Sequence, residues 1–131
     1  MKHELSKFTI RHILERSTQR HAKRVALTVI GNKKNTYTYE KLKEDVDSIA
    51  TYLMKHKVKK GDKIGVLGES SPQWGVAYLS VVSSGAIAVP ILPDFSAKEV
   101  STIIKHSELS GIFVSSKSIE KVPTSIIKDK T

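Results

Sequence analysis

The stretch KIGVLGESSPQWGVAYLSVVSSGAIAV, residues 63–89, decides the fold. Its first five residues, Lys63 to Leu67, predict a short and mostly apolar strand. Ser71-Pro72 then opens a helix, because serine caps a helix start and proline suits the first helical turn. Gly85 is well placed to end that helix. Ala86 to Val89 predicts a second strand, and its near-continuous apolar character is typical of burial on both faces.

A second unit of the same kind follows toward the C-terminus. Pro90 and Pro93 predict an extended loop, because the residue before a proline avoids helical backbone angles. Ser96-Ala97-Lys98-Glu99 is a capping box that starts the next helix. Gly111 to Val114 then predicts a last buried strand. Strand, helix, strand, helix, strand makes two βαβ units, so we expect right-handed crossovers and a parallel sheet with helices packed on it.

The part of the chain before Lys63 predicts a helix, a β-hairpin and a second helix. The expected elements are a helix from Ile10 to about His21 capped by Thr9, strands at Val25–Ile30 and Asn35–Thr38, and a helix capped by Thr38. In the first helix, Ile10, Ile13 and Leu14 share one apolar face. The second helix has the clearest apolar stripe. That stripe consists of Leu42, Val46, Ile49, Ala50 and Leu53. The predicted fold class is therefore α/β, a parallel or mixed sheet with helices packed on it, preceded by a helix and a β-hairpin.

The length and the end of the chain bear on its domain organisation. The chain has 131 residues and no cysteine, which suits one domain or a piece of a larger one and excludes disulfides and cysteine chemistry. After Ser115 the pattern fades into polar residues, so 117–131 predicts a loose tail. Because no clear helix follows the last strand, the predicted sheet is incomplete. We interpret 1–131 as a portion cut from a longer domain.

The formal net charge of +9 is concentrated in the first half of the chain. The densest stretch is Lys55–Lys60. A basic face attracts nucleic acid or anionic membrane, whereas cations also collect at a helix C-terminus because the helix dipole favours them there. The second interpretation is favoured, since no aromatic residue interleaves the lysines as in a single-strand platform. A non-enzymatic basic interaction module remains the alternative function.

No membrane-spanning helix is expected. The uncharged segment Ser70–Pro93 contains Ser80, Ser83, Ser84 and Gly85, and Pro90 would break a helix there. A spanning helix needs about 20 mainly apolar residues. The expected location is cytoplasmic, with peripheral membrane contact as a further expectation.

The residues themselves offer no self-sufficient active site. No phosphate-binding glycine motif, no G-x-S-x-G elbow and no metal-ligand spacing among the five histidines occurs. Gly65–Ser70 ends a strand, where open α/β sheets bind ligands. Its glycines lack dinucleotide-loop spacing and Glu69 would repel phosphate, so a tight strand-to-helix turn is the favoured interpretation. Trp74, the single tryptophan, either lines a ligand tunnel or fills the core. We predict no catalytic, cofactor-binding or metal-binding residue.

Four short motifs occur in order along the chain. They are YTYEKL from Tyr37, KKGDKIGV from Lys59, ESSPQW from Glu69 and SGAIAVP from Ser84. In order and spacing they resemble the N-terminal region of the adenylate-forming (AMP-binding) superfamily across about residues 9–116. The third motif is similar to a helix start common in long-chain fatty-acid–CoA ligases, so the resemblance is strongest to the acyl-CoA synthetases.

This resemblance implies that the parent enzyme is an ATP-dependent ligase. Such an enzyme uses ATP and Mg²⁺ to convert a fatty acid to an acyl-adenylate with release of pyrophosphate, then passes the acyl group to CoA with release of AMP. The family's Ser/Thr/Gly-rich phosphate loop, its adenine and ribose motifs and its catalytic lysine have no counterpart in this sequence. The chain alone is therefore expected to be inactive and to bind no cofactor.

The resemblance also implies the partners of this chain. Fatty acid, ATP and CoA would bind through the missing remainder, and no specific nucleic acid partner is expected. Trp74 and Tyr78 would stand in the wall of the acyl site. A sheet with exposed edges also predicts self-association as a homodimer.

Overall fold

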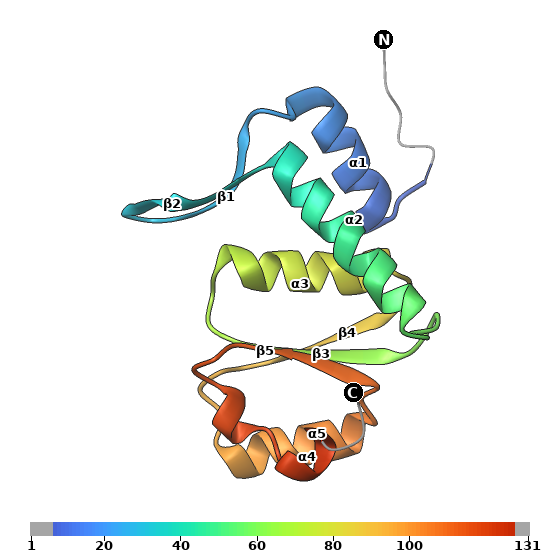
Figure 1. Cartoon of the computed structure of the whole chain (residues 1–131), viewed down its shortest axis with the longest axis vertical. Helices are drawn as coiled ribbons and strands as arrows, with labels where there is room; N and C mark the ends of the chain where they lie inside the picture. The colour runs from blue at the N-terminus through green and yellow to red at the C-terminus, as the bar shows by residue number, and fades with distance from the viewer. Residues whose placement is uncertain (1–6, 128–131) are drawn as a thin grey trace.

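The computed structural model describes residues 7–127. The elements, in chain order, are α1 (Ile10–His21), β1 (Val25–Val29), β2 (Asn32–Thr38), α2 (Tyr39–Lys55), β3 (Lys63–Leu67), α3 (Pro72–Ser83), β4 (Ile87–Ile91), α4 (Ala97–Ser107), β5 (Gly111–Val114), the 3₁₀-helix η1 (Ile119–Lys121) and α5 (Thr124–Ile127). A small sheet of β3, β4 and β5 lies between α3 on one face and α4 with α5 on the other, and α1 and α2 stack over α3 (Figure 1). This arrangement confirms the predicted α/β class.

The central sheet is parallel, with the strand order β4-β3-β5. Ile64 of β3 is in register with Ala88 of β4 and with Gly111 of β5. Since β3 has a neighbour on each side and helices on both faces, Ile64 and Val66 are almost completely buried. The two βαβ units predicted from the sequence are both present.

The edge position of β4 corrects two predictions. We expected Ala86–Val89 to be buried on both faces and Pro90 to begin a loop. Instead the strand runs to Ile91, Pro90 pairs opposite Val66, and Ile87 is about half exposed. An edge strand tolerates proline because one side of it needs no hydrogen-bond donor. Strand β5 is likewise an edge, and its residues are half-buried rather than buried.

The helix starts follow the predicted capping residues. The hydroxyls of Thr9, Thr38, Ser71 and Ser96 each accept a main-chain N–H from the residue three positions on. At Ser96 the capping box is complete, because its own N–H donates to Glu99 Oε2 at 2.8 Å. Gly85 follows α3 with φ +89°, a conformation that favours glycine. These local predictions are confirmed.

Replacing Ser96 by alanine should lower the free energy of unfolding by about 1 kcal/mol at neutral pH. Hydrogen bonds from the main chain and hydroxyl of Ser96 hold the pKa of Glu99 below its ordinary value. A depressed carboxyl pKa contributes stability above the unfolded-state pKa, and that contribution is lost as pH falls through the folded-state pKa. Urea unfolding at neutral and acid pH should therefore show the gap between wild type and Ser96→Ala narrowing in acid. A gap that stays constant or widens would contradict this cap.

Helix α3 is buried on two sides, against the sheet and against α1 and α2. Ala77 and Val81 pack in a cluster with Ile64 of β3 and with Leu53 near the end of α2. Val76 packs with a second cluster that contains Leu14 of α1 and the apolar stripe of α2. Because of this double cover, Val76 and Val81 are both buried, at 6% and 0% exposed.

Two regions differ from what the sequence predicts, namely α1 and the segment after β5. In α1 only Leu14 is buried, whereas Ile10 and Ile13 are 44% and 45% exposed, so the predicted apolar face is covered only in part. After β5, where no element was expected, η1 and α5 follow, and Val122 is buried against the α4 side of the sheet. Residues 128–131 of the predicted loose tail lie outside the described residues. None of the helices in 7–127 has the length and apolar character to span a bilayer.

Candidate functional site

The strand order creates a switch point between β3 and β5. The chain leaves β3 through α3 and returns as β4 on one side, then crosses through α4 to β5 on the other side. After β3 the chain enters α3 on one face of the sheet, and after β5 it enters η1 and α5 on the other face (Figure 1), so the segments that leave the carboxyl ends of β3 and β5 diverge. In open α/β sheets ligands bind in the crevice outside such a point.

A pocket of about 180 Å³ lies at this switch point. The end of β3 and the turn after it contribute Gly68 and Glu69, α3 contributes Trp74, and β5 with the residue after it contributes Phe113 and Ser115. Most of the lining is apolar. The pocket therefore combines an aromatic wall with a few polar groups at the carboxyl edge of the sheet.

Gly68 lets the ends of β3 and β5 approach closely. A Cβ atom at this position would lie 3.3 Å from the Cβ of Ser115, a contact that requires the neighbour to move. The tight strand-to-helix turn predicted for this segment is confirmed, since β3 ends at Leu67 and α3 begins at Pro72. The glycine serves close approach of two chain segments rather than a phosphate loop.

Glu69 is the charged residue of the pocket lining. A hydrogen bond from its own main-chain N–H lowers the pKa of the Glu69 carboxyl, and the hydroxyl of Ser115 and the charge of Lys117 lower it further. The carboxyl group is therefore ionised at neutral pH. A pocket with this charge repels phosphate and carboxylate groups and attracts cations.

The two aromatic residues predicted as site residues lie side by side on α3. The rings of Trp74 and Tyr78 stack with centroids 5.4 Å apart and an interplanar angle of 10°. Trp74 lines the pocket, whereas Tyr78 lies one turn further along the helix and does not line it. The structure thus brings both residues together but gives only Trp74 access to the pocket. Their assignment to an acyl site stays a prediction.

Sequence reasoning missed Phe113, Ser115 and the role of Glu69 as a pocket residue. Glu69 was considered only as a group that repels phosphate. The available signal was positional, since Glu69 and Ser115 each come soon after a predicted strand of the same parallel sheet. The carboxyl ends of neighbouring parallel strands meet at one edge, so the pair was within reach of prediction.

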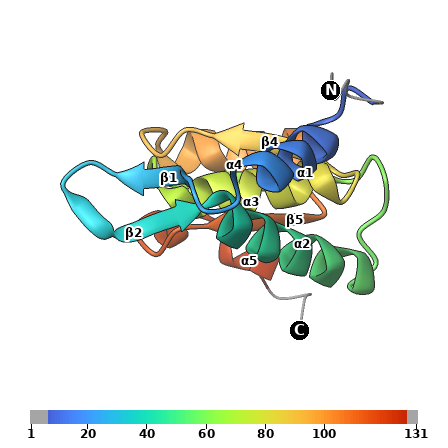
Figure 2. The ribbon, with the colours of Figure 1, turned by 90° about the horizontal axis from the view of Figure 1, so that it is seen from above.

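The β-hairpin is attached to α3 beside the pocket. Asn35 and Gln73 exchange two amide hydrogen bonds, of 3.1 and 2.9 Å. Two residues further along α3, a Cβ at Gly75 would lie 3.0 Å from Leu27 Cδ1, so the hairpin packs closely there. Viewed from above, the hairpin extends from the side of the helical layer (Figure 2). The amide of Gln73 is therefore occupied by the hairpin.

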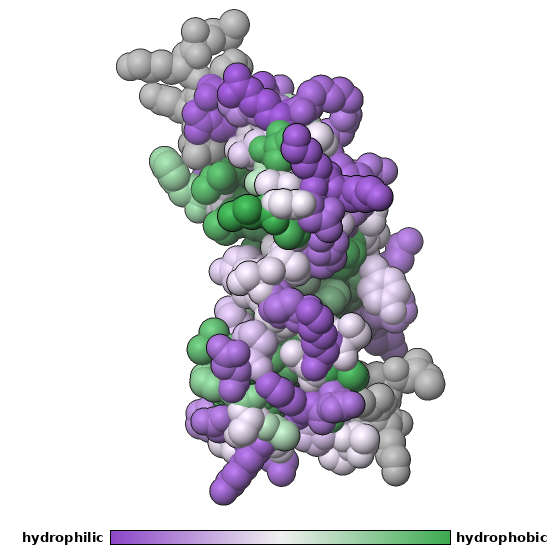
Figure 3. All heavy atoms as spheres, turned by 90° about the vertical axis from the view of Figure 1, so that its left-hand side faces the viewer, coloured by the Kyte–Doolittle hydropathy of each residue, from purple (hydrophilic) through white to green (hydrophobic). Residues whose placement is uncertain are grey.

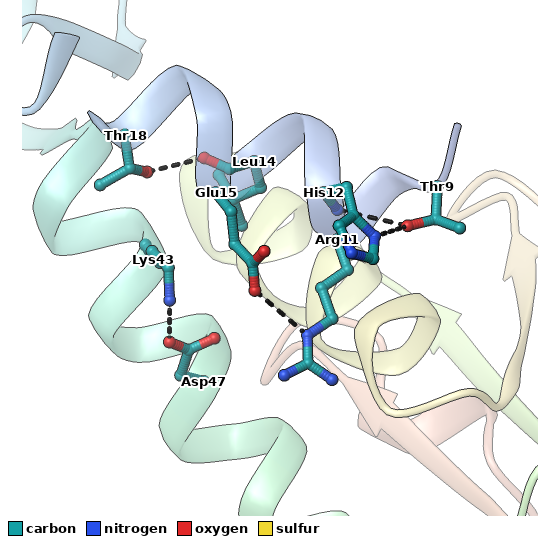
Figure 4. Close-up of polar contacts among 8 residues, drawn as sticks. All are labelled: Thr9, Arg11, His12, Leu14, Glu15, Thr18, Lys43 and Asp47. Carbon is teal, nitrogen blue, oxygen red and sulfur yellow. Dashed lines mark hydrogen bonds and ion pairs between the residues drawn. The ribbon is translucent and has the colours of Figure 1, made fainter. Parts of the chain in front are cut away.

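The charged side chains of α1 and α2 form surface pairs away from the pocket. Figure 4 shows Arg11 with Glu15 on α1 and Lys43 with Asp47 on α2, each four residues apart in sequence. Pairs of this spacing support a helix surface by a few tenths of a kcal/mol. Hydrophilic side chains cover much of the face in Figure 3, with hydrophobic ones gathered mainly in its upper half.

The described residues do not fit ATP, Mg²⁺ or CoA. The charged group that lines the pocket is an anion, and phosphate cradles use cations and main-chain N–H groups. Within residues 7–127 no group of three His, Asp or Glu side chains is arranged to hold a metal ion.

Comparison with known proteins identifies the family. The family model for the AMP-binding enzymes matches residues 14–131, and the chain belongs to this family. The mitochondrial medium-chain acyl-CoA ligase ACSF2 of Homo sapiens is 33% identical over 104 residues, which cover 79% of this chain and 17% of that protein. Surfactin synthase subunit 1 of Bacillus subtilis (strain 168) is 32% identical over 99 residues, 76% of this chain and 3% of that protein.

Solved structures share the fold. Coronafacic acid ligase from Pectobacterium brasiliense superposes with a TM-score of 0.83 at 24% identity, covering 93% of this chain and 24% of that one. The anthranilate CoA ligase AuaEII gives a TM-score of 0.82 at 22% identity, covering 92% and 22%. The chain thus spans less than a third of these relatives. The predicted superfamily is confirmed, whereas the relatives do not single out long-chain fatty acids.

Proposed function

We propose that this chain is the N-terminal portion of an ATP-dependent acid–thiol ligase and that it is inactive alone. The observation that carries the proposal is the family match across residues 14–131. Acyl-CoA ligases among the relatives, including ACSF2, favour CoA as the acceptor. In the parent reaction a carboxylate oxygen attacks the α-phosphorus of ATP and pyrophosphate leaves. The CoA thiol then attacks the acyl carbon, which forms the thioester and releases AMP.

In this proposal the chain supplies scaffold rather than chemistry. The sheet and its helices support the nucleotide-binding core contributed by the remainder of the enzyme, where fatty acid, ATP and CoA bind. The edges of β4 and β5 carry no further strand among the described residues. Open sheet edges pair readily with other strands, which supports homodimer formation by the chain when it is expressed alone.

Trp74 and Tyr78 are our proposed wall of the acyl site. The apolar lining around Trp74 supports this role, and the stack on Tyr78 fixes the indole ring. Because the Glu69 carboxylate lines the same pocket, the carboxylate of a fatty acid would be repelled there. The apolar end of the acyl chain, not its carboxylate, would lie against Trp74. A long acyl chain is the proposed preference, and the ESSPQW motif from Glu69 is its only support.

The test is ATP–pyrophosphate exchange by the native gene product. The proposal predicts that its coding sequence continues beyond Thr131 into a Ser/Thr/Gly-rich phosphate loop. The purified product should then exchange pyrophosphate into ATP only when a carboxylic acid is added, and acids of graded chain length would identify the substrate class. A native product that ends at Thr131, or one that exchanges with no acid, would remove the ligase proposal.

A further inference from the structure

We propose that the pocket at the carboxyl ends of β3 and β5 binds a small protonated amine carried on an aromatic or apolar body. The geometry that points to this class is a carboxylate, Glu69, in one pocket with the indole of Trp74 and the ring of Phe113. This inference goes beyond the ligase proposal, which places only the apolar end of an acyl chain against Trp74 and assigns no ligand group to Glu69.

The charge of the pocket favours a cation. Glu69 lines the pocket together with Ser115 and is the charged residue of that lining. Lys117 is the cation near Glu69, and it is exposed to solvent. An exposed lysine is strongly hydrated and flexible, so a ligand ammonium group held in the pocket can compete with it.

The aromatic wall favours the same class. Trp74 is fixed by its stack on Tyr78, with centroids 5.4 Å apart. A fixed indole face attracts a cation through its quadrupole, and tryptophan is the best aromatic partner for this interaction. A ligand that places an ammonium group between an indole and a carboxylate gains both interactions at once.

The other ligand classes find no partner in the pocket. No lysine or arginine lines it, so the charged side chain that a phosphate or carboxylate would meet there is Glu69. The start of α3 is already capped, since the Ser71 hydroxyl accepts the Trp74 N–H at 3.2 Å. The Gln73 amide is occupied by Asn35. At about 180 Å³ the pocket is also smaller than the roughly 300–1,000 Å³ typical of sites for drug-sized ligands.

The experiment uses the fluorescence of Trp74, which is the single tryptophan of the chain. The 131-residue chain is titrated at neutral pH with three probes of similar size: benzylamine, benzyl alcohol and benzoate. We expect a saturable fluorescence change with benzylamine at about millimolar concentration, as befits a ligand of eight heavy atoms. Benzyl alcohol and benzoate should bind at least about tenfold more weakly, since they lack the charge that pairs with Glu69.

Matched variants separate the pocket from the general field of the protein. Glu69→Gln should weaken benzylamine binding about tenfold and leave benzyl alcohol binding unchanged. Glu120→Gln changes net charge equally at an exposed residue of η1 and should leave both titrations unchanged.

Three outcomes would overturn the proposal. Benzyl alcohol that binds as tightly as benzylamine would define a merely apolar pocket. Benzoate that binds more tightly than benzylamine would reverse the assigned charge preference. Equal loss of benzylamine binding in Glu69→Gln and Glu120→Gln would place the effect outside the pocket. The three-probe comparison on the unaltered chain stands even if a variant fails to fold. None of these results bears on the ligase proposal, which is tested by pyrophosphate exchange.

Discussion

Replacing Ile64 by alanine is expected to lower the free energy of unfolding by about 2–5 kcal/mol. Ile64 lies on the central strand β3, is 2% exposed, and packs between the sheet and the α2–α3 layer with Leu53 and Val81. Truncation leaves a cavity among these side chains, and a packed interior relaxes only in part to fill it. Because small domains are stable by about 5–15 kcal/mol in total, the loss is a large share of the whole.

Urea unfolding followed by far-ultraviolet circular dichroism measures this effect. Ile30→Ala is the matched control, because the same side chain at the hairpin turn is 100% exposed. That variant should stay within about 0.5 kcal/mol of the wild type. If the two variants were equally stable, the core would not lie where the structure puts it.

Placing aspartate at Val46 is expected to cost about 3–5 kcal/mol, since it buries a charge without a partner. Val46 is 0% exposed and packs with Leu14, Leu42 and Val76 where α1, α2 and α3 meet. The cost differs in kind from that at Ile64, because desolvation of a carboxylate adds to the loss of packing. Val46→Asp should therefore separate α1 and α2 from α3.

The control for Val46→Asp is the same change at Val25, which is 56% exposed on β1. Val25→Asp should cost about 1 kcal/mol or less, from lost strand propensity. Thermal melts of both variants at neutral pH give the comparison. A melting temperature for Val46→Asp as high as that for Val25→Asp would contradict the three-helix contact.

Local rules predicted the helix starts because their chemistry is contained in a few consecutive residues. A serine or threonine three positions before its main-chain donor satisfies that donor whatever the rest of the chain does. Thus Thr9, Thr38, Ser71 and Ser96 were all predicted as caps and are found as caps. The βαβ order was predictable for a similar reason, since apolar strands alternated with helical periodicity.

The position of a strand within the sheet was harder to predict from the sequence. An apolar run predicts a strand, but whether the strand is central or at an edge depends on strand order, which is a property of the whole fold. For this reason the apolar run predicts burial of Ala86–Val89 and a strand end at Pro90, whereas β4 lies at the edge of the sheet and runs to Ile91. At Ile10 and Ile13 the pattern marked an apolar face correctly but could not say how much of it a neighbour covers.

The pocket is a long-range product of the parallel sheet. Glu69 and Ser115 are far apart in sequence, and only the pairing of β3 with β5 brings them together. The register that places Leu67 beside Val114 fixes this meeting. Trp74 could be proposed as a site residue from its residue type alone. Glu69 and Ser115 could be placed beside it only with knowledge of the strand order.

The most direct test of the central claim is equilibrium dialysis of the 131-residue chain against ATP with excess Mg²⁺. The account predicts no saturable nucleotide binding, because the described residues offer a carboxylate rather than cations at the carboxyl edge of the sheet. Adding a fatty acid should not change this result. Saturable binding of one ATP per chain would contradict the claim that this chain is the scaffold of a ligase whose nucleotide site lies elsewhere.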